Sequence, residues 1–329
     1  MSVVAARLHR QLLADNGGAT PHEVVAHLGA VQAQDYLGAL WAVGARMKTA
    51  VESDVERALA ERSIVRCWPM RGTLHFVAAE DVRWMLELLA PGVLTRHRPR
   101  LEREFGLDAR TLRRSRPLVE RALRGGIAMT RSEIYALIEN GGIATGGSRG
   151  LHILFALAHE RVICFGARRG KQPTLVLLDE WVPPAKSKTR EEALAEIARR
   201  YFIGHGPATV ADLMWWSGLT MKETKEAIAL AGVDVESEAN ARVTRPSVQL
   251  LPPFDEYAVG YKDRTSILDP AVDKAIVVID GLAAGQWKRT LRGESVDITI
   301  SPFRALTAHE SRALERAANR YAAFLGRTR

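Results

Sequence analysis

A recurring helix start constrains the fold of this chain more than any other feature of its sequence. Thr20, Thr130 and Thr209 are each followed three residues later by an acidic residue, a pattern typical of the capping box at a helix N-terminus. Each pattern opens a segment with helical spacing of apolar residues, which a turn then interrupts. Because capping boxes occur in most helical proteins, the fold prediction depends on the elements that each one precedes.

The segment after Thr130 carries the fullest pattern. It predicts a helix to about residue 139, a glycine-rich turn and a second helix over 148–160. Two β-like runs, 162–165 and 174–178, come next, on either side of a basic turn. Helix, turn, helix and two-stranded hairpin is the order of a winged helix.

The segment after Thr209 repeats the helix-turn-helix part of this order. It predicts a turn at Gly218 and a second helix that Thr220 caps. We expect Lys222 and Lys225 on the exposed face of that helix, where a recognition helix keeps the residues that contact phosphates.

The segment after Thr20 predicts several short helices and then a hairpin. The helices cover about 20–31, 36–47 and 53–61. The hairpin after them covers 64–77 and has its turn at Pro69-Met70.

The end of the chain predicts another hairpin, over 286–300, and a terminal helix that Thr307 caps. Taken together, the elements predict an α+β fold of three tandem winged-helix (helix-turn-helix) units. We expect these units to cover residues 1–95, 96–185 and 186–329.

Arginine carries most of the positive charge. The 329 residues include 46 lysines and arginines against 38 acids, a formal charge of +8, and the stretch from Arg96 to Arg131 contains eleven arginines and four acids. Guanidinium groups match phosphate geometry, and a basic stripe is typical of proteins that bind nucleic acids. Solvated helix faces in an arginine-rich proteome are the alternative explanation.

Several function classes lack their usual sequence features. Apolar runs fall far short of the roughly eighteen residues that a membrane helix needs, and Arg7 and Arg10 interrupt any signal peptide. We therefore expect a cytoplasmic protein. Cys67 and Cys164 belong to no metal or redox motif, and phosphate-loop and dinucleotide patterns are absent. We expect neither a metal nor another cofactor.

The segment around Gln32, Gln34 and Asp35 is the most unusual in the chain, because these polar residues interrupt apparently apolar helix. Residues two apart share a face in an extended segment but not in a helix. Joint action of the two amides therefore requires a helix break here, with Asp35 capping the next helix. Exposed linker amides beside a simple helix cap are the alternative.

Two further polar patterns qualify as candidate sites. Their spacing of two places Arg71, Thr73 and His75 on one face of a strand. That face could form the wall of a cleft, or it could be an ordinary solvent-facing surface. Within the cluster over 250–264, acids could orient basic groups that touch phosphates, and an interdomain ion-pair network would leave the same pattern. The residues singled out in that cluster are Asp255, Tyr257, Tyr261, Lys262, Asp263 and Arg264.

Three motifs together resemble the tandem winged-helix bacterial DNA glycosylases, the AlkZ/YcaQ-like family. They are the segments 31–35, 66–75 (Arg-Cys-Trp-Pro-Met-Arg-Gly-Thr-Leu-His) and 250–264, in the family's order, and the similarity spans nearly the whole chain. The resemblance implies three winged-helix units forming a DNA channel, and excision of alkylated purines. The double-glutamine motif of this sequence resembles that of the family branch associated with self-resistance to DNA-crosslinking natural products.

The resemblance implies that Gln32 and Gln34 are catalytic, and Asp35 is a further candidate as general base. Because no lysine that could form a Schiff base lies near the glutamines in the sequence, we expect a monofunctional enzyme. We expect it to act as a monomer on double-stranded DNA with alkylated or crosslinked purines, and not at a membrane. The residues expected to contact DNA are Arg66, Arg71, Thr73, His75, Arg168, Arg169, Lys171, Lys222, Lys225, Asp255, Tyr257, Lys262, Arg264, Lys288 and Arg292. The alternatives are a non-catalytic winged-helix transcription regulator and a lesion-binding protein.

Overall fold

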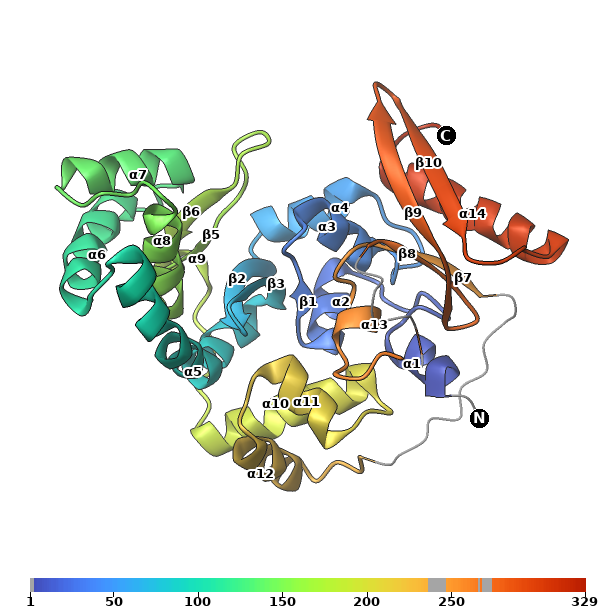
Figure 1. Ribbon diagram of the computed structural model, residues 1–329, viewed down its shortest axis with the longest axis horizontal. Helices are drawn as coiled ribbons and strands as arrows, with labels where there is room; N and C mark the ends of the chain where they lie inside the picture. The colour runs from blue at the N-terminus through green and yellow to red at the C-terminus, as the bar shows by residue number, and fades with distance from the viewer. Residues whose placement is uncertain (1–2, 236–246, 266, 268–273) are drawn as a thin grey trace. The chain divides into compact units, whose positions relative to one another are not determined.

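The computed structural model describes residues 3–235, 247–265, 267 and 274–329 (Figure 1). The chain divides into two compact units, which we describe separately. Unit 1 comprises residues 1–58, 194–216 and 220–329, and unit 2 comprises residues 59–193 and 217–219. Both combine helices with antiparallel strands, so the α+β prediction is confirmed. The division into three winged-helix units stays a prediction.

Unit 2 begins with an antiparallel hairpin, β2 (Ile64–Met70) and β3 (Thr73–Ala78). The turn predicted at Pro69-Met70 is wrong, because it lies at Arg71 and Gly72, where φ is +55° and +78°. Such left-handed backbone suits a two-residue hairpin turn, and glycine adopts it without strain. Two helices come after the hairpin: α5 (Ala79–Phe105) and α6 (Ala109–Leu123).

The remainder of unit 2 has the predicted order of helix, turn, helix and hairpin. Its helices are α7 (Arg131–Asn140) and α8 (Arg149–His159), and Thr130 forms the expected capping box. Its strands are β4 (Met129–Thr130), β5 (Ile163–Phe165) and β6 (Thr174–Leu177), with β6 in the centre; the short helix α9 (Leu178–Trp181) comes next. One apolar core, which includes Val119, Ile138 and Leu157, joins these elements to α5 and α6.

Unit 1 contains the start of the chain as short helices around one short strand. Their bounds are α1 (Val3–Arg10), α2 (Pro21–Leu28), β1 (Val31–Gln32), α3 (Tyr36–Gly44) and α4 (Glu52–Ala60). Thr20 caps α2 with a full capping box. The helix predicted to reach residue 31 ends earlier, because Gly29 adopts a positive φ of +77°.

The middle of the chain adds three helices to unit 1. They are α10 (Arg190–His205), α11 (Val210–Ser217) and α12 (Met221–Ala231). The predicted turn lies at Gly218, with φ +75°, and Thr220 forms the predicted capping box. The helix-turn-helix prediction for this segment is therefore confirmed.

The end of the chain forms a four-stranded antiparallel sheet and a terminal helix. The elements are β7 (Val248–Leu251), α13 (Glu256–Val259), β8 (Ile276–Ile279), β9 (Leu282–Arg292), β10 (Ser295–Pro302) and α14 (Ala308–Phe324). The predicted hairpin pairs Arg292 with Ser295 at its tip, and the capping box at Thr307 is present.

Tryptophans hold α14 against this sheet. The ring of Tyr321 lies 5.0 Å from that of Trp41 and 4.9 Å from that of Trp287, both edge-on. The two indoles donate hydrogen bonds to the β7 carbonyls of Leu250 and Leu251. Aromatic packing with satisfied indole N–H groups stabilises such a core. Among the described helices, none is long and apolar enough to span a membrane.

Candidate functional site

The two predicted catalytic glutamines lie in a non-helical segment. Helix α2 ends at Leu28, Gln32 is the last residue of β1, and α3 begins at Tyr36. The predicted helix break is therefore confirmed. The strand ends at Gln32 and Gln34 lies in a bend, so a common face for the two side chains, which an extended backbone would provide, stays a prediction.

The two amides differ in their access to solvent. Gln32 is only 9% exposed and Ala33 is fully buried, whereas Gln34 is exposed. Gln32 therefore does not fit the alternative of an exposed linker amide. Gln34 is the glutamine that a water molecule or a ligand can reach directly.

Asp35 occupies the N-cap position of α3 but does not cap it as expected. Its backbone is extended, and no cap hydrogen bond from its side chain is found among the described residues. Instead, its carboxylate lies over Gly38, where an added Cβ would come within 2.6 Å of Oδ2 and 3.2 Å of the Pro252 Cβ. A side chain at position 38 would therefore crowd Asp35 and Pro252, and glycine accommodates their close approach to α3.

The cluster over 250–264 is largely internal. Asp255 forms a bidentate ion pair with Arg46, with N···O distances of 2.8 and 2.9 Å, and both side chains are 0% exposed. The Tyr257 hydroxyl is buried and donates to the Gly281 carbonyl at 2.9 Å. The predicted DNA contacts of Asp255 and Tyr257 are therefore corrected, since both side chains are committed to partners inside unit 1.

Burial also fixes the protonation of the tyrosines in this cluster. Loss of solvation raises the pKa of both Tyr257 and Tyr261. Their hydroxyls therefore remain protonated donors, and the Tyr261 hydroxyl donates to the His205 carbonyl at 2.8 Å. Lys262 is exposed and Arg264 is half-buried, so their DNA contacts stay predictions.

Glu256 connects this cluster to the glutamine segment. The backbone N–H of Gln32 donates to Glu256 Oε1 at 2.9 Å, and the Trp216 indole N–H donates to Oε2 at 2.9 Å. His205 Nε2 lies 3.3 Å from the same Oε2, and the side chains of both His205 and Glu256 are 0% exposed. The sequence analysis missed Glu256, because spacing alone does not reveal a partner more than 200 residues away.

The polar ladder predicted on the 64–77 hairpin is not formed. Arg71 lies in the turn rather than in a strand, and His75 is fully buried with Nδ1 3.0 Å from the Thr73 carbonyl. Arg66 is also buried, and its guanidinium lies over the Phe165 ring at 4.7 Å. The predicted DNA contacts of His75 and Arg66 are corrected accordingly, while half-exposed Arg71 and Thr73 stay predictions.

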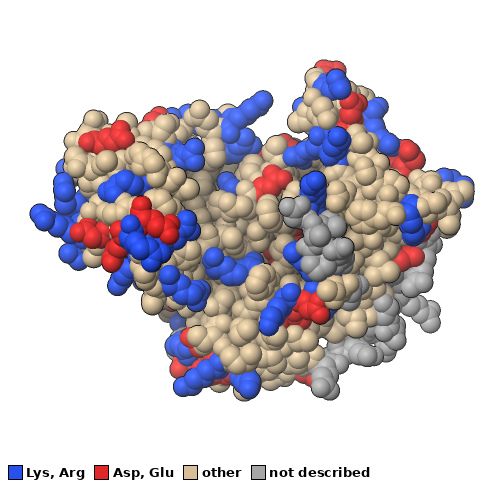
Figure 2. Space-filling view, viewed as in Figure 1, with Lys and Arg blue, Asp and Glu red and all other residues tan. Residues whose placement is uncertain are grey.

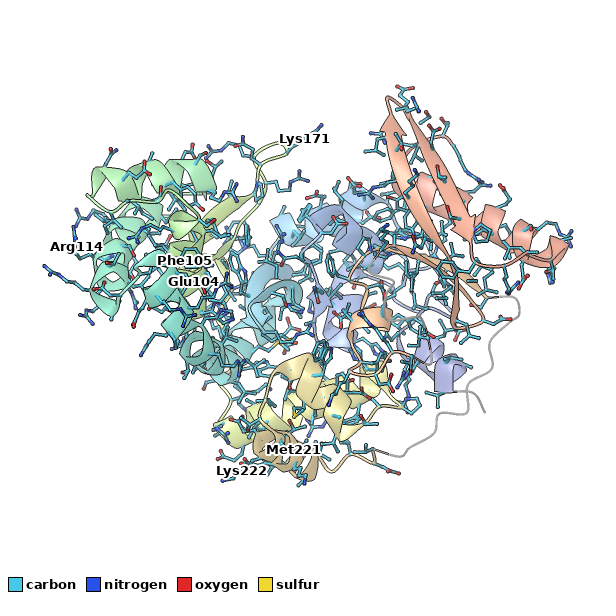
Figure 3. The ribbon with its side chains drawn as sticks, viewed as in Figure 1. Glu104, Phe105, Arg114, Lys171, Met221 and Lys222 are labelled. Atoms are coloured by element: carbon cyan, nitrogen blue, oxygen red, sulfur yellow. The ribbon has the colours of Figure 1, made fainter. Side chains whose placement is uncertain are left out.

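The basic turn between β5 and β6 is accessible. Lys171 is exposed at its tip, as Figure 3 shows, and Arg168 is half-buried. Arg169 is exposed but pairs with Glu133 at 2.7 Å. A hydrogen bond from the Thr130 backbone N–H and, to a smaller extent, the pair with Arg169 lower the pKa of Glu133 to about 2.

Helix α12 and the β9–β10 hairpin also present their predicted basic residues. Lys222 and Lys225 are exposed on α12, which agrees with the predicted face, and Figure 3 shows Lys222 on this helix. Lys288 and Arg292 are exposed on β9, and Arg292 forms an ion pair with Asp297. Whether these four residues contact DNA stays a prediction.

All eleven arginines between Arg96 and Arg131 are exposed in unit 2. Arg100 and Arg103 pair with Glu104, and Arg116 pairs with Glu120 and Glu160. The other eight have no ion pair within the described parts of the chain. Figure 2 shows basic side chains over α5 and α6 with acidic ones among them, and Figure 3 shows Arg114 directed away from α6.

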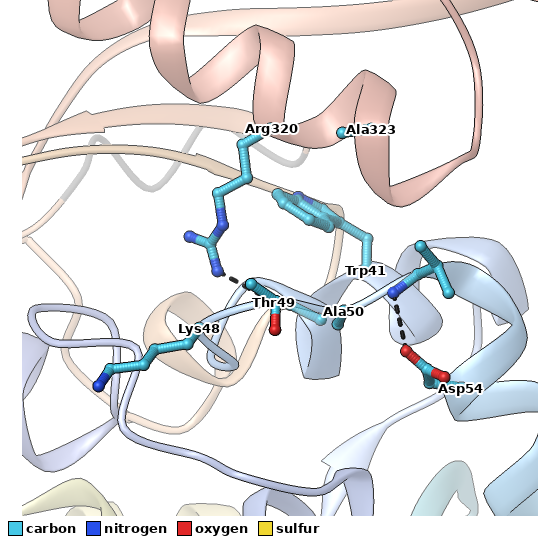
Figure 4. Close-up of a pocket in the computed structure, with 9 residues that line it drawn as sticks. Trp41, Lys48, Thr49, Ala50, Asp54, Arg320 and Ala323 are labelled. Atoms are coloured by element: carbon cyan, nitrogen blue, oxygen red, sulfur yellow. Dashed lines mark hydrogen bonds between the residues drawn. The ribbon is translucent and has the colours of Figure 1, made fainter.

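A pocket of about 370 Å³ lies in unit 1, beside Trp41, Lys48, Asp54 and Arg320 (Figure 4). The Arg320 guanidinium donates to the carbonyls of Gly44 and Ala45 at 3.2 and 3.0 Å, at the C-terminal end of α3, where a cation is favourable. None of the described residues 31–35 lines this pocket. Over all the residues that the structure describes, there is no cluster of three or more His, Cys, Asp or Glu suited to a metal ion.

Comparisons with known proteins agree with the fold over nearly the whole chain. A family model described as DNA glycosylase AlkZ-like matches residues 25–324. The interstrand DNA cross-link repair glycosylase of Streptomyces sahachiroi is 27% identical over 348 residues, covering 92% of this chain and 90% of that protein. The solved structure of Streptomyces sahachiroi DNA glycosylase AlkZ aligns with a TM-score of 0.78 and 25% identity, covering 99% of this chain and 96% of that one. The chain therefore belongs to the AlkZ-like DNA glycosylase family.

Proposed function

We propose that this protein is a monofunctional DNA glycosylase that hydrolyses the N-glycosidic bond of purines alkylated at N7 or N3. The observation that carries the proposal is the non-helical segment between α2 and α3, which holds Gln34 in solvent and Gln32 against the core. Such a segment can direct an amide oxygen at a substrate without a metal or a nucleotide. Membership of the family supports DNA as the substrate.

The chemistry of the lesion explains why an amide suffices. An alkylated purine carries positive charge, so its glycosidic bond is weak and the transition state resembles an oxocarbenium ion. In the proposed step, the oxygen of water bonds to C1′ while the electron pair of the C–N bond leaves with the base, and the water proton passes to solvent. A carboxamide oxygen contributes position and partial negative charge.

We assign different roles to the two amides. Exposed Gln34 accepts a hydrogen bond from the attacking water, and Gln32, which is 9% exposed, shares that task or steadies the sugar. Neutral amides do not titrate near neutrality, so a rate that is nearly flat with pH is expected. If Asp35 is instead the general base, the pH–rate profile has an acid limb that Asp35→Asn abolishes.

Hydrolysis without strand cleavage is expected from the residue types near this segment. A lyase step requires an amine that forms a Schiff base with the sugar. Lys48 is the first lysine of the chain, and it lines the separate pocket beside Trp41 (Figure 4). The product is therefore expected to be an intact strand with an abasic site.

We further propose that crosslinked purines are substrates and that the protein binds double-stranded DNA as a monomer in the nucleoid. The name of the Streptomyces sahachiroi relative, an interstrand cross-link repair glycosylase, supports the first point. Phosphate contacts are proposed for the accessible basic and polar residues, which are Arg71, Thr73, Arg168, Arg169, Lys171, Lys222, Lys225, Lys262, Arg264, Lys288 and Arg292.

The test is base release from three duplexes of one sequence: unmodified, carrying N7-methylguanine, and carrying a nitrogen-mustard crosslink. Release from the second supports the glycosylase proposal, and release from the third supports crosslink unhooking. Tight binding to the lesion without an abasic product would instead support a lesion-binding protein. Preference for one undamaged sequence, again without product, would support a transcription regulator.

A further inference from the structure

The Glu256 carboxylate occupies an unusual position, because it is fully buried and yet faces donors from three separate segments. These donors are the Gln32 backbone N–H at 2.9 Å, the Trp216 indole N–H at 2.9 Å and His205 Nε2 at 3.3 Å. They belong to β1, α11 and α10. A buried carboxylate is costly unless its oxygens accept hydrogen bonds, so this geometry is specific rather than incidental.

The backbone around Glu256 is fixed as firmly as its side chain. One residue earlier, Asp255 holds Arg46, which comes after α3, and also accepts the Tyr257 backbone N–H at 2.9 Å. The Gln11 side chain donates to the Glu256 carbonyl at 3.3 Å. Phe254 is held at φ +62°, a conformation that a bulky residue keeps only when its surroundings impose it.

These contacts hold the glutamine segment directly at Gln32 and hold the chain again after α3, at Arg46. The carboxylate of Glu256 holds the backbone of Gln32, two residues before Gln34, while Asp255 holds Arg46 beyond the end of α3. A shift of about 1 Å in a catalytic group can lower a rate about 100-fold. The segment that contains Gln34 is therefore sensitive to the placement of Glu256, although Glu256 itself is inaccessible to substrate.

We propose that Glu256 is a positioning residue, which orients the two glutamines through its hydrogen bond to the backbone N–H of Gln32. This inference rests on the proposed role of the glutamines in hydrolysis. It assigns Glu256 no contact with DNA. Its effect should appear in the rate of the chemical step and in the local stability of the Gln32 amide rather than in DNA affinity.

The test compares Glu256→Gln with a matched control, Asp81→Asn. Asp81 is a buried acid of unit 2 that also accepts a tryptophan indole N–H, from Trp84 at 2.9 Å. Both variants are measured for thermal unfolding, for single-turnover release of N7-methylguanine, and for affinity toward a duplex that carries an abasic-site analogue.

We expect Glu256→Gln to lower the single-turnover rate by about 10- to 100-fold and to leave duplex affinity within about threefold. At a temperature where both variants are folded, Asp81→Asn should keep the wild-type rate within about threefold. A Glu256→Gln enzyme with the wild-type rate would overturn the proposal. So would a rate loss that Asp81→Asn matches, or one that a loss of affinity explains.

A second measurement is independent of activity. Hydrogen exchange at the Gln32 amide should be slow in the folded wild-type protein and faster in Glu256→Gln. Rapid exchange in the wild type would overturn the proposal even if the variant does not fold. If the amide is protected but the wild type releases no base, the proposed function fails while the positioning of the segment by Glu256 stands.

Discussion

At the start of α13, Asp255 and Glu256 are buried among partners in unit 1, whereas the eleven arginines between Arg96 and Arg131 in unit 2 all face solvent. Both regions are clusters of charge in the sequence. In the first region, the carboxylates of Asp255 and Glu256 contact groups inside unit 1. In the second, eight of the eleven arginines have no acid partner in the described parts of the chain and are available to an external anion.

The comparison teaches that charge clustering identifies polar regions but not their role. The ion pair of Asp255 joins it to Arg46, 209 residues away in the sequence, so no local pattern could reveal it. A local pattern does describe Arg100 and Glu104, which lie one helical turn apart and pair at 2.7 Å. Burial, which depends on the whole fold, separates a structural charge from one that can bind DNA.

The largest expected effect concerns the buried region. Arg46→Met leaves Asp255 buried without its counter-charge, and removal of one partner from a buried pair costs about 3–5 kcal/mol. Urea unfolding of the wild type and the variant measures this loss. Adding Asp255→Asn should recover part of it, because a neutral amide needs no counter-charge. A loss below about 1 kcal/mol would place this pair with ordinary surface ion pairs and would remove the contrast between the two regions.

The second effect concerns a buried histidine in unit 2, the unit that also carries the exposed arginines. Burial lowers the pKa of His159 from 6.5 to about 4. Between these values the unfolded chain binds the proton and the folded chain does not, so the folded state is stabilised above pH 6.5 and loses stability as the pH falls toward 4. The loss should reach about 3 kcal/mol, since one pKa unit corresponds to about 1.4 kcal/mol.

Urea unfolding at a series of pH values measures the His159 effect, and His159→Leu is the control. The variant should lose less stability than the wild type between pH 6.5 and 4. Equal losses in both proteins would assign the pH dependence to other groups.

The smallest effect on stability is expected at the exposed arginines. Arg110→Gln, Arg121→Gln and Arg124→Gln together should change the unfolding free energy by about 0.5 kcal/mol or less. Their effect on DNA should be larger, because each lost phosphate contact reduces the slope of log affinity against log salt by about 0.9. Duplex binding at several salt concentrations measures the slope.

The matched control for these arginines replaces Arg100, Arg103 and Arg116, whose guanidinium groups already pair with Glu104 and Glu120. It should reduce the salt slope less than the triple variant does. An unchanged slope in the triple variant would show that the exposed arginines of α6 do not face DNA, and the two regions would then differ in burial but not in function.

Much of the local structure could be predicted, because it depends on neighbouring residues. The capping boxes at Thr20, Thr130, Thr220 and Thr307 are present, since each needs only a threonine and an acid three residues apart. The helix break near Gln32 was predictable because two glutamines and an aspartate interrupt runs that otherwise read as apolar helix.

Other elements were not predictable from local patterns. Helix α5 runs through Pro91 and Pro99, each of which normally signals a helix end; the sequence analysis did not predict it. The burial of His75 and Tyr257 was missed for a different reason. The spacing of polar residues along a strand or loop does not reveal which other segments pack over them, so His75 and Tyr257 were predicted to be at the surface.

The central claim is that Gln34 acts on the chemical step, and single-turnover release of N7-methylguanine by wild type and Gln34→Ala tests it most directly. Loss of a positioned catalytic group predicts a rate lower by about 10² to 10⁴, with duplex affinity nearly unchanged. Equal rates in the two proteins would contradict the account and remove the glutamine segment as its active site.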